Sequence, residues 1–130
     1  MNKKNTLGKK ERLKSKKLIG KLFEEGESIK KYPFRLIFLI QDENSLLKNQ
    51  ASFSVPKRNF KKAVDRNRIK RLIKEAYRLE QRKILQDYNL PFIIMITYLG
   101  KKEPIFSDVK ENIKELLTLF KEKIGSFLPK

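Results

Sequence analysis

The chain has 130 residues, with 32 Lys and Arg against 15 Asp and Glu, a net charge of +17 and a pI near 10.1. This length predicts one domain with a modest core, and the absence of Cys and His excludes disulfides, thiol nucleophiles and the usual general base and metal ligand. There is no apolar run of about 18 residues and no apolar segment after the basic N-terminus, so we predict neither a membrane span nor a secretory signal, and a cytoplasmic location.

The N-terminal part is predicted to contain an arm followed by a helix. Residues 1–14 are polar and basic, and we expect a flexible arm that becomes ordered on a partner, ahead of a single domain over residues 15–130. Ser15 is a candidate N-cap, and the helix should end at Gly26. Its apolar positions are Leu18, Ile19, Leu22 and Phe23.

Two strands are expected next. Phe34–Ile40 is a mostly apolar run of strand length, and residues 42–49 are polar and turn-like. Residues 51–55 alternate between apolar and polar side chains, which is typical of a half-buried strand. The simplest pairing of these two strands is a hairpin.

The C-terminal half is predicted to form helix, strand and helix. The apolar phase breaks after Pro56, so we expect a turn through 59–63 and a helix from about 64 to 80. Residues 92–98 form another buried strand. A core-packing helix should begin near Ser107, with apolar positions at Val109, Ile113, Leu116, Leu117, Phe120 and Ile124. The predicted order is α-β-β-α-β-α, an α+β two-layer sandwich with helices on a small sheet.

The segment RNRIKRLIKEAYR, residues 66–78, carries the strongest functional signal. On a helix, Ile69, Leu72, Ile73 and Ala76 fall on one side, and basic residues with one amide fall on the other. A solvated helix face normally mixes both signs of charge, but the acidic support on this face is limited to Glu75. A face that repels itself in this way indicates a polyanionic partner.

The excess charge is concentrated rather than spread. Residues 57–83 hold 12 basic and 3 acidic side chains, residues 1–35 hold 12 and 4, and the rest of the chain holds 8 of each. Such concentration favours a nucleic-acid surface. The candidate RNA-binding residues are Lys57, Arg58, Lys61, Lys62, Arg66, Asn67, Arg68, Lys70, Arg71, Lys74 and Arg78. Among the aromatic residues we select Phe23 and Phe34 as exposed rings for base stacking.

Enzymatic chemistry by the protein itself is not supported. Acidic residues cluster only as the pairs Asp42-Glu43 and Glu24-Glu25, and no Gly-rich phosphate loop or nucleophile motif is present. We therefore predict no catalytic residue and no metal or cofactor held by the protein alone.

The sequence resembles the protein subunit of bacterial ribonuclease P. The resemblance rests on residues 53–58, FSVPKR, and on residues 63–77, AVDRNRIKRLIKEAY, and it extends from about Arg12 to Phe120. That family's signature is a strand ending in serine and lysine, a short connector, an Ala-Val pair and an Arg-Asn-Arg helix. The resemblance implies a small mixed sheet with a left-handed βαβ crossover, a fold related to a ribosomal protein domain, where the general rule favours the right-handed form.

The resemblance also implies a function. A large RNA carries the active site and Mg²⁺ of the endonuclease, and the protein, inactive alone, binds this RNA as a monomer at 1:1 together with the 5′ leader of precursor tRNA. Arg66, Asn67, Arg68, Lys70 and Arg71 match the motif that faces the RNA, and Phe23, Phe34, Ser54 and Lys57 match positions of the leader-binding cleft. The chain departs from the family at Ile19 and Ile37, which are often aromatic there, and at the connector, where Asn59-Phe60-Lys61-Lys62 lacks a common glycine.

Three other functions compete with this one. A structural ribosomal protein would be equally small and basic, but with long basic tails and dispersed charge. A DNA-binding module would need a second helix closely before the basic helix. A membrane-surface helix would need bulky aromatics on its apolar face, which the core uses here.

Overall fold

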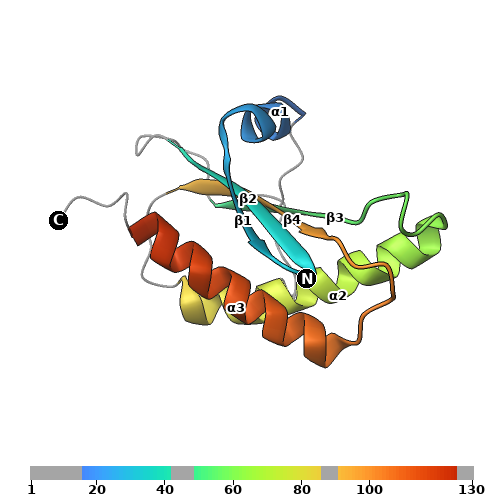
Figure 1. Ribbon diagram of the computed structural model, residues 1–130. Coiled ribbons are helices and arrows are strands. Elements are labelled where there is room, and N and C mark those ends of the chain that lie inside the picture. Colours follow the sequence, from blue (N-terminus) through green and yellow to red (C-terminus); the bar gives the residue numbers. More distant parts are fainter. Residues whose placement is uncertain (1–15, 42–48, 86–90, 126–130) are drawn as a thin grey trace, which may run out of the picture.

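The computed structural model describes residues 16–41, 49–85 and 91–125 (Figure 1). The elements within these residues are α1 (Lys16–Glu25), β1 (Glu27–Lys31), β2 (Phe34–Ile40), β3 (Gln50–Ser54), α2 (Ala63–Ile84), β4 (Phe92–Tyr98) and α3 (Phe106–Gly125). The predicted α+β class, with helices on a small mixed sheet, is confirmed. The predicted arm over 1–14, the Ser15 cap and most of the turn over 42–49 lie outside the described residues.

The sheet has the strand order β1-β2-β4-β3, in which β2 runs antiparallel to β1 and β4, and β3 runs parallel to β4. The predicted hairpin between β2 and β3 is therefore wrong, because β4 lies between them. Strand β4 is apolar on both faces, and all of Phe92–Ile96 is buried. A strand of this kind needs a neighbour on each side and cover on both faces, which only the centre of the sheet provides.

Strand β1 was not predicted, so the predicted element order is one strand short. Its sequence ESIKK is exposed except at the half-buried Ile29. The strand lies at the edge of the sheet, pairs only with β2 among the described strands, and carries Lys31, whose Nζ lies 3.3 Å from Glu115 Oε2 of α3. A short, charged edge strand of this kind gives little apolar periodicity to detect and blocks edge-to-edge association.

The two faces of the sheet are covered differently. Helices α2 and α3 lie side by side across one face and bury the main core, which includes Leu36, Ile94 and Ile96 from the sheet (Figure 1). Helix α1 sits on the other face, where Leu22 packs with Ile37, Ile93 and Met95. The chain leaves α1 through Gly26, where a Cβ would stand 2.9 Å from both Ile37 Cγ2 and Phe38 O, so only glycine fits this close approach.

Helix α2 begins close to its predicted start. Ala63 and Val64 are exposed at its first turn, whereas Ile69 and Ile73 are fully buried. This confirms that the apolar positions before and after residue 65 cannot share one face. The helix continues to Ile84, four residues beyond the predicted end.

Candidate nucleic-acid interface

The connector between β3 and α2 holds four exposed cations, Lys57, Arg58, Lys61 and Lys62. It turns at Pro56, whose carbonyl accepts hydrogen bonds from the backbone N–H groups of Asn59 and Phe60. The Asn59 side-chain amide donates to Leu99 O at 3.4 Å, and the Phe60 ring packs 6.2 Å from the Tyr98 ring. These contacts bind the connector to the end of β4 and so fix the backbone that carries the cations.

Arg66 is directed toward the connector rather than outward. One of its terminal nitrogens, Nη1, donates to Phe60 O at 2.8 Å and to Lys61 O at 2.9 Å. Helix α2 has no side-chain N-cap bond at Lys62, so Arg66 is the side chain that joins its first turn to the preceding loop. Its predicted role in RNA binding is therefore combined with a structural one.

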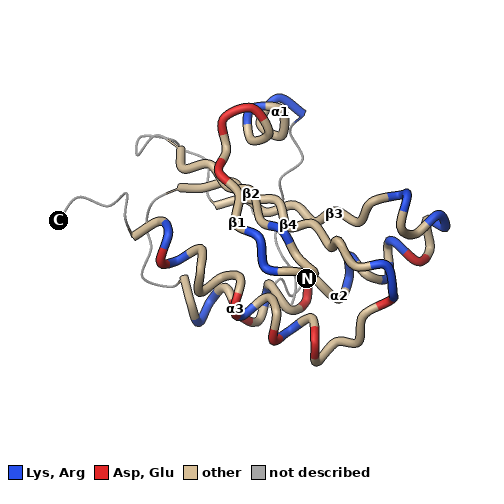
Figure 2. Tube along the Cα trace, in the orientation of Figure 1, with Lys and Arg blue, Asp and Glu red and all other residues tan. Residues whose placement is uncertain are grey.

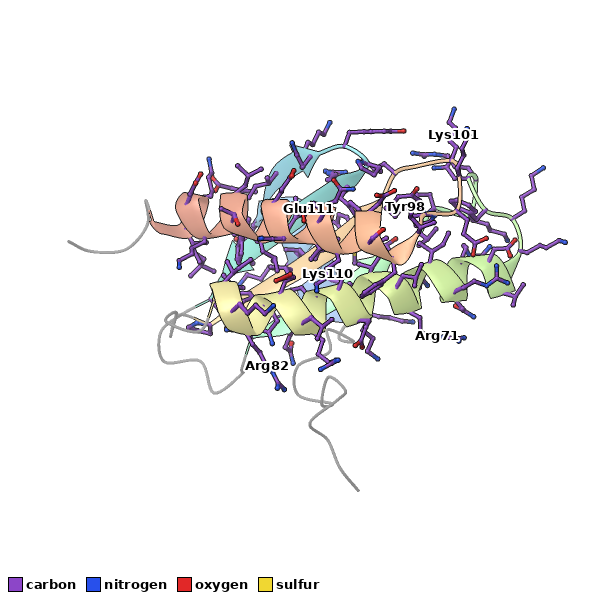
Figure 3. All side chains as sticks on the ribbon, turned by 90° about the horizontal axis from the view of Figure 1, so that it is seen from below. Arg71, Arg82, Tyr98, Lys101, Lys110 and Glu111 are labelled. Atoms are coloured by element: carbon purple, nitrogen blue, oxygen red, sulfur yellow. The ribbon has the colours of Figure 1, made fainter. Side chains whose placement is uncertain are left out.

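The outward face of α2 carries a row of polar and basic side chains that we call the α2 ridge. Its members, at positions i, i+3, i+4, i+7 and i+11, are Asn67, Lys70, Arg71, Lys74 and Arg78. Figure 3 shows Arg71 projecting from α2 on the side away from α3. In Figure 2 the basic positions of the connector and of the first half of α2 gather at one end of the described part of the chain. The predicted cations of the connector and of the ridge thus come together as one surface, whereas Arg66 and Arg68 have partners within the protein.

Arg68 lies on a different side of the helix from the ridge. Its Nη1 lies 2.7 Å from Glu103 Oε1, in the loop before α3, and 3.6 Å from Asp65 Oδ1. The hydrogen bond to Glu103 raises the pKa of Arg68, which stays charged. A phosphate that binds Arg68 has to compete with this carboxylate.

Arg78 is also paired within the protein. Its Nε donates to Glu75 Oε2 at 3.1 Å, and its Nη2 contacts Glu75 Oε1. The hydrogen bond from Arg78 lowers the pKa of Glu75, so the carboxylate is ionised at neutral pH. The ridge therefore offers its strongest net positive charge at Lys70 and Arg71, toward the connector.

The sheet face that carries α1 contains a second group of polar residues, which we call the polar row. The register places Lys30 opposite Arg35, Arg35 opposite Thr97, and Thr97 opposite Ser54, so these four side chains cross the sheet on one face. Among the described elements, only α1 packs its apolar side chains on this face, and it does so on Ile37, Ile93 and Met95, away from the row. Ser54 was predicted as a site residue; Lys30, Arg35 and Thr97 were missed. The detectable signal was one charged residue inside the apolar run of β2.

The two aromatic candidates have opposite environments. Phe23 is 56% exposed on α1, which confirms the predicted accessible ring. Phe34 is 1% exposed, and its ring packs 5.3 Å from Tyr98. The prediction of an exposed ring at Phe34 is wrong, because its position in β2 has the same parity as Leu36 and Phe38 and faces the helices.

The described residues provide neither a metal site nor a membrane span. No group of three or more acidic side chains in these residues lies close enough together to hold a metal ion. Likewise, none of the helices in this part of the chain combines the length and apolar character needed to cross a bilayer.

Comparisons with known proteins agree on one family. The family model described as Ribonuclease P matches residues 7–121. The Ribonuclease P protein component of Porphyromonas gingivalis is 32% identical over 114 residues, covering 85% of this chain and 83% of that protein. That of Chlorobium phaeobacteroides is 35% identical over 126 residues, covering 87% and 86%.

Solved structures share the fold. The RNase P protein from Thermotoga maritima has a TM-score of 0.67 at 24% identity, covering 84% of this chain and 96% of that one. The RNase P protein of Staphylococcus aureus also has a TM-score of 0.67, at 21% identity, covering 85% and 94%.

Proposed function

This chain belongs to the ribonuclease P protein family, and we propose that it binds the catalytic RNA of ribonuclease P and the 5′ leader of precursor tRNA. Together with the RNA it would form the endonuclease that removes the leader and produces the mature 5′ end. The observation that carries this proposal is the basic surface made by the connector and the α2 ridge. These cations share one surface, and the connector that bears four of them is fastened to β4 and α2.

The chemistry of the basic surface suits a phosphate backbone. Lysine and arginine side chains release condensed counterions when they neutralise phosphates, which supplies affinity without base recognition. Asn67, exposed beside Arg71, adds an amide that can donate to and accept from a base edge or a ribose hydroxyl. We assign this surface to the catalytic RNA.

The sheet face with α1 is assigned to the leader. Phe23 presents an exposed ring on α1, and Ser54 lies in the polar row at the end of β3, three residues before Lys57. A single strand on this face could stack a base on Phe23 and place its backbone near the hydroxyl and the lysine. The buried Phe34 is not included in this assignment.

Catalysis is assigned to the RNA, with Mg²⁺ held mainly by that RNA in a 1:1 complex. The protein's residues would position the RNA and the leader and would not move protons or form covalent intermediates. Neither His nor Cys occurs in the sequence to serve as a general base or a nucleophile.

Sequencing the RNA that co-purifies with the tagged protein from its own cells tests the partner. A single abundant non-coding RNA, which cleaves precursor tRNA at the 5′ end once recombined with the protein and Mg²⁺, is expected. Recovery of ribosomal RNA instead, or cleavage by protein proven free of RNA, would overturn the proposal.

A further inference from the structure

Arg35 is an unusual residue for the middle of a small sheet. It is half-buried in β2, and its Nε is buried without a hydrogen-bond partner among the described residues. Its cross-strand neighbours are Lys30 and Thr97, so the nearest charge in the register has the same sign. A partly desolvated cation next to a like charge lowers the stability of the fold unless a partner supplies the missing anion.

No carboxylate of the sheet faces this cation. The polar row consists of Lys30, Arg35, Thr97 and Ser54, and the next row along the same face consists of Ser28, Ile37, Met95 and Ser52. Both rows are free of acidic residues. Helices α2 and α3, with most of the acidic residues of the described helices, lie on the opposite face of the sheet. Helix α1, on the same face as Arg35, ends in the exposed Glu24 and Glu25, and Glu25 lies beside Phe38 and Ile40, toward the far end of β2.

We infer that Arg35 and Lys30 form a binding site for the backbone phosphates of single-stranded RNA, with the Thr97 and Ser54 hydroxyls beside them. The guanidinium can hold a phosphate with two parallel hydrogen bonds, and the hydroxyls are further donors along the row. The inference rests on the proposed function and specifies how this face would hold the leader: by charge on the backbone.

The position of the row favours RNA over an acidic peptide. Four neighbouring strands about 4.8 Å apart give the row a length of about 14 Å, enough for a short stretch of single strand. Its Ser54 end leads through Pro56 into the exposed Lys57 and Arg58 of the connector. The row therefore extends the basic surface across the sheet, and one polyanion could follow both.

The row contains no aromatic ring. Its residues are cationic or hydroxylic, and in the next row the apolar Ile37 and Met95 are 5% and 8% exposed beside α1. Contacts made by such a row do not distinguish bases. Binding at this site should therefore depend on salt and not on leader sequence.

The test uses protein reconstituted with its catalytic RNA, and compares precursor tRNA bearing either of two leaders of unrelated sequence with mature tRNA. Arg35→Gln replaces the charged guanidinium by a neutral amide that can still form hydrogen bonds. Lys30→Gln and Lys31→Gln form a matched pair on β1, because Lys30 lies in the row and Lys31 points to the helix face, where it pairs with Glu115. Affinity is measured at several salt concentrations.

We expect Arg35→Gln to weaken the binding of both precursors by about tenfold and to leave mature tRNA unchanged. The slope of log affinity against log salt should fall by about 0.7, the value for one phosphate contact on a single strand. Lys30→Gln should produce a smaller loss of the same kind, because Lys30 is exposed whereas Arg35 is half-buried, and Lys31→Gln should produce none.

Three outcomes overturn the inference: wild-type affinity in Arg35→Gln, equal losses for precursor and mature tRNA, or a loss confined to one leader sequence. A wild-type holoenzyme that does not distinguish precursor from mature tRNA would instead contradict leader binding in the proposed function. The melting temperature of Arg35→Gln should equal or exceed that of the wild type, because an unpaired charge is removed. If this variant does not fold, Lys30→Gln on the exposed edge strand decides the question alone.

Discussion

Helices α2 and α3 are built alike on the inside and differently on the outside. They have 22 and 20 residues, contact each other along one face of the sheet, and bury apolar side chains in the same core. Helix α2 carries eight basic and three acidic residues, whereas α3 carries four of each. A helix can therefore pack on this sheet with balanced charges, as α3 does, and the excess positive charge of α2 is not required for packing.

The acidic residues of α2 do not neutralise the centre of its outer face. Asp65 lies in the first turn near Arg68, Glu75 pairs with Arg78, and Glu80 is buried. Lys70 and Arg71 stand between these positions. The difference between the two helices is thus largest where the family motif lies, and each prediction below either breaks or sharpens that difference.

The inner faces should be equivalent. Ile73 of α2 and Ile113 of α3 are both fully buried, so Ile73→Ala and Ile113→Ala should each lower the free energy of unfolding by about 2–5 kcal/mol. Urea denaturation of the free proteins measures both. A loss for one variant several-fold smaller than for the other would show that the two helices do not share one cooperative core.

The outer faces should not be equivalent. The triple variant Lys70→Gln, Arg71→Gln and Lys74→Gln should weaken binding of the catalytic RNA by about 3 kcal/mol, roughly one for each phosphate contact, without loss of helicity. Filter binding measures the RNA affinity, and circular dichroism measures the helicity.

The matched control is Lys110→Gln, Lys114→Gln and Lys121→Gln on α3, which removes the same charge from the neighbouring helix. This triple variant should bind RNA almost as the wild type does. Equal losses for both triple variants would mean that only net charge matters and that the α2 ridge is not a binding surface.

Much of this arrangement could be predicted because the relevant signals are local. The periodicity of Ile69, Ile73 and Ala76 fixes which side of α2 is buried, and the family motif then identifies its outer face. The alternation over residues 51–55 correctly placed Ala51 and Val55 in the core. Both inferences need only the residues within one element.

The errors concern relations between elements. Strand pairing depends on which strand lies at the centre of the sheet. Because β4 is apolar almost throughout, it is most stable between two other strands, and it therefore pairs with β2 in place of β3. The roles of Phe34 and Arg35 depend on the parity of one strand, which the apolar run around them conceals. The contacts of Arg66 and Arg68 depend on loops whose course the sequence did not predict.

Arg66 differs from the ridge residues of α2 because it also holds the backbone of the connector. Because its guanidinium holds Phe60 O and Lys61 O, Arg66→Gln should lower the free energy of unfolding by about 1 kcal/mol. Arg82→Gln, an exposed change in the last turn of α2, serves as the control and should leave stability unchanged. Unfolding curves that coincide for the two variants would contradict the anchoring role.

Glu103 is the point where the segment before α3 reduces the charge of α2. Its carboxylate holds Arg68 at 2.7 Å, so Glu103→Gln should release Arg68 and tighten RNA binding about two- to fivefold at low salt. Glu122→Gln removes the same charge at an exposed position in the last turn of α3, at the end of the helix remote from Glu103, and should have less effect. Equal tightening by the two variants would mean that the change in net charge, and not the release of Arg68, strengthens RNA binding.

The smallest expected effect concerns the ion pair between Glu75 and Arg78 on the outer face of α2. The pKa of Glu75 is lowered by the hydrogen bond from Arg78, so the unfolded chain binds the proton more readily than the folded one. The stabilisation is therefore fully present above the ordinary pKa of Glu75, near 4.5, and is lost as the pH falls through its lower folded value. Because the Glu75 side chain is 45% exposed, solvent screens the pair and the effect stays small. Glu75→Gln should lower the melting temperature slightly at pH 7 and not at about pH 2.5, and a difference that persists unchanged at low pH would assign the loss to packing instead of charge.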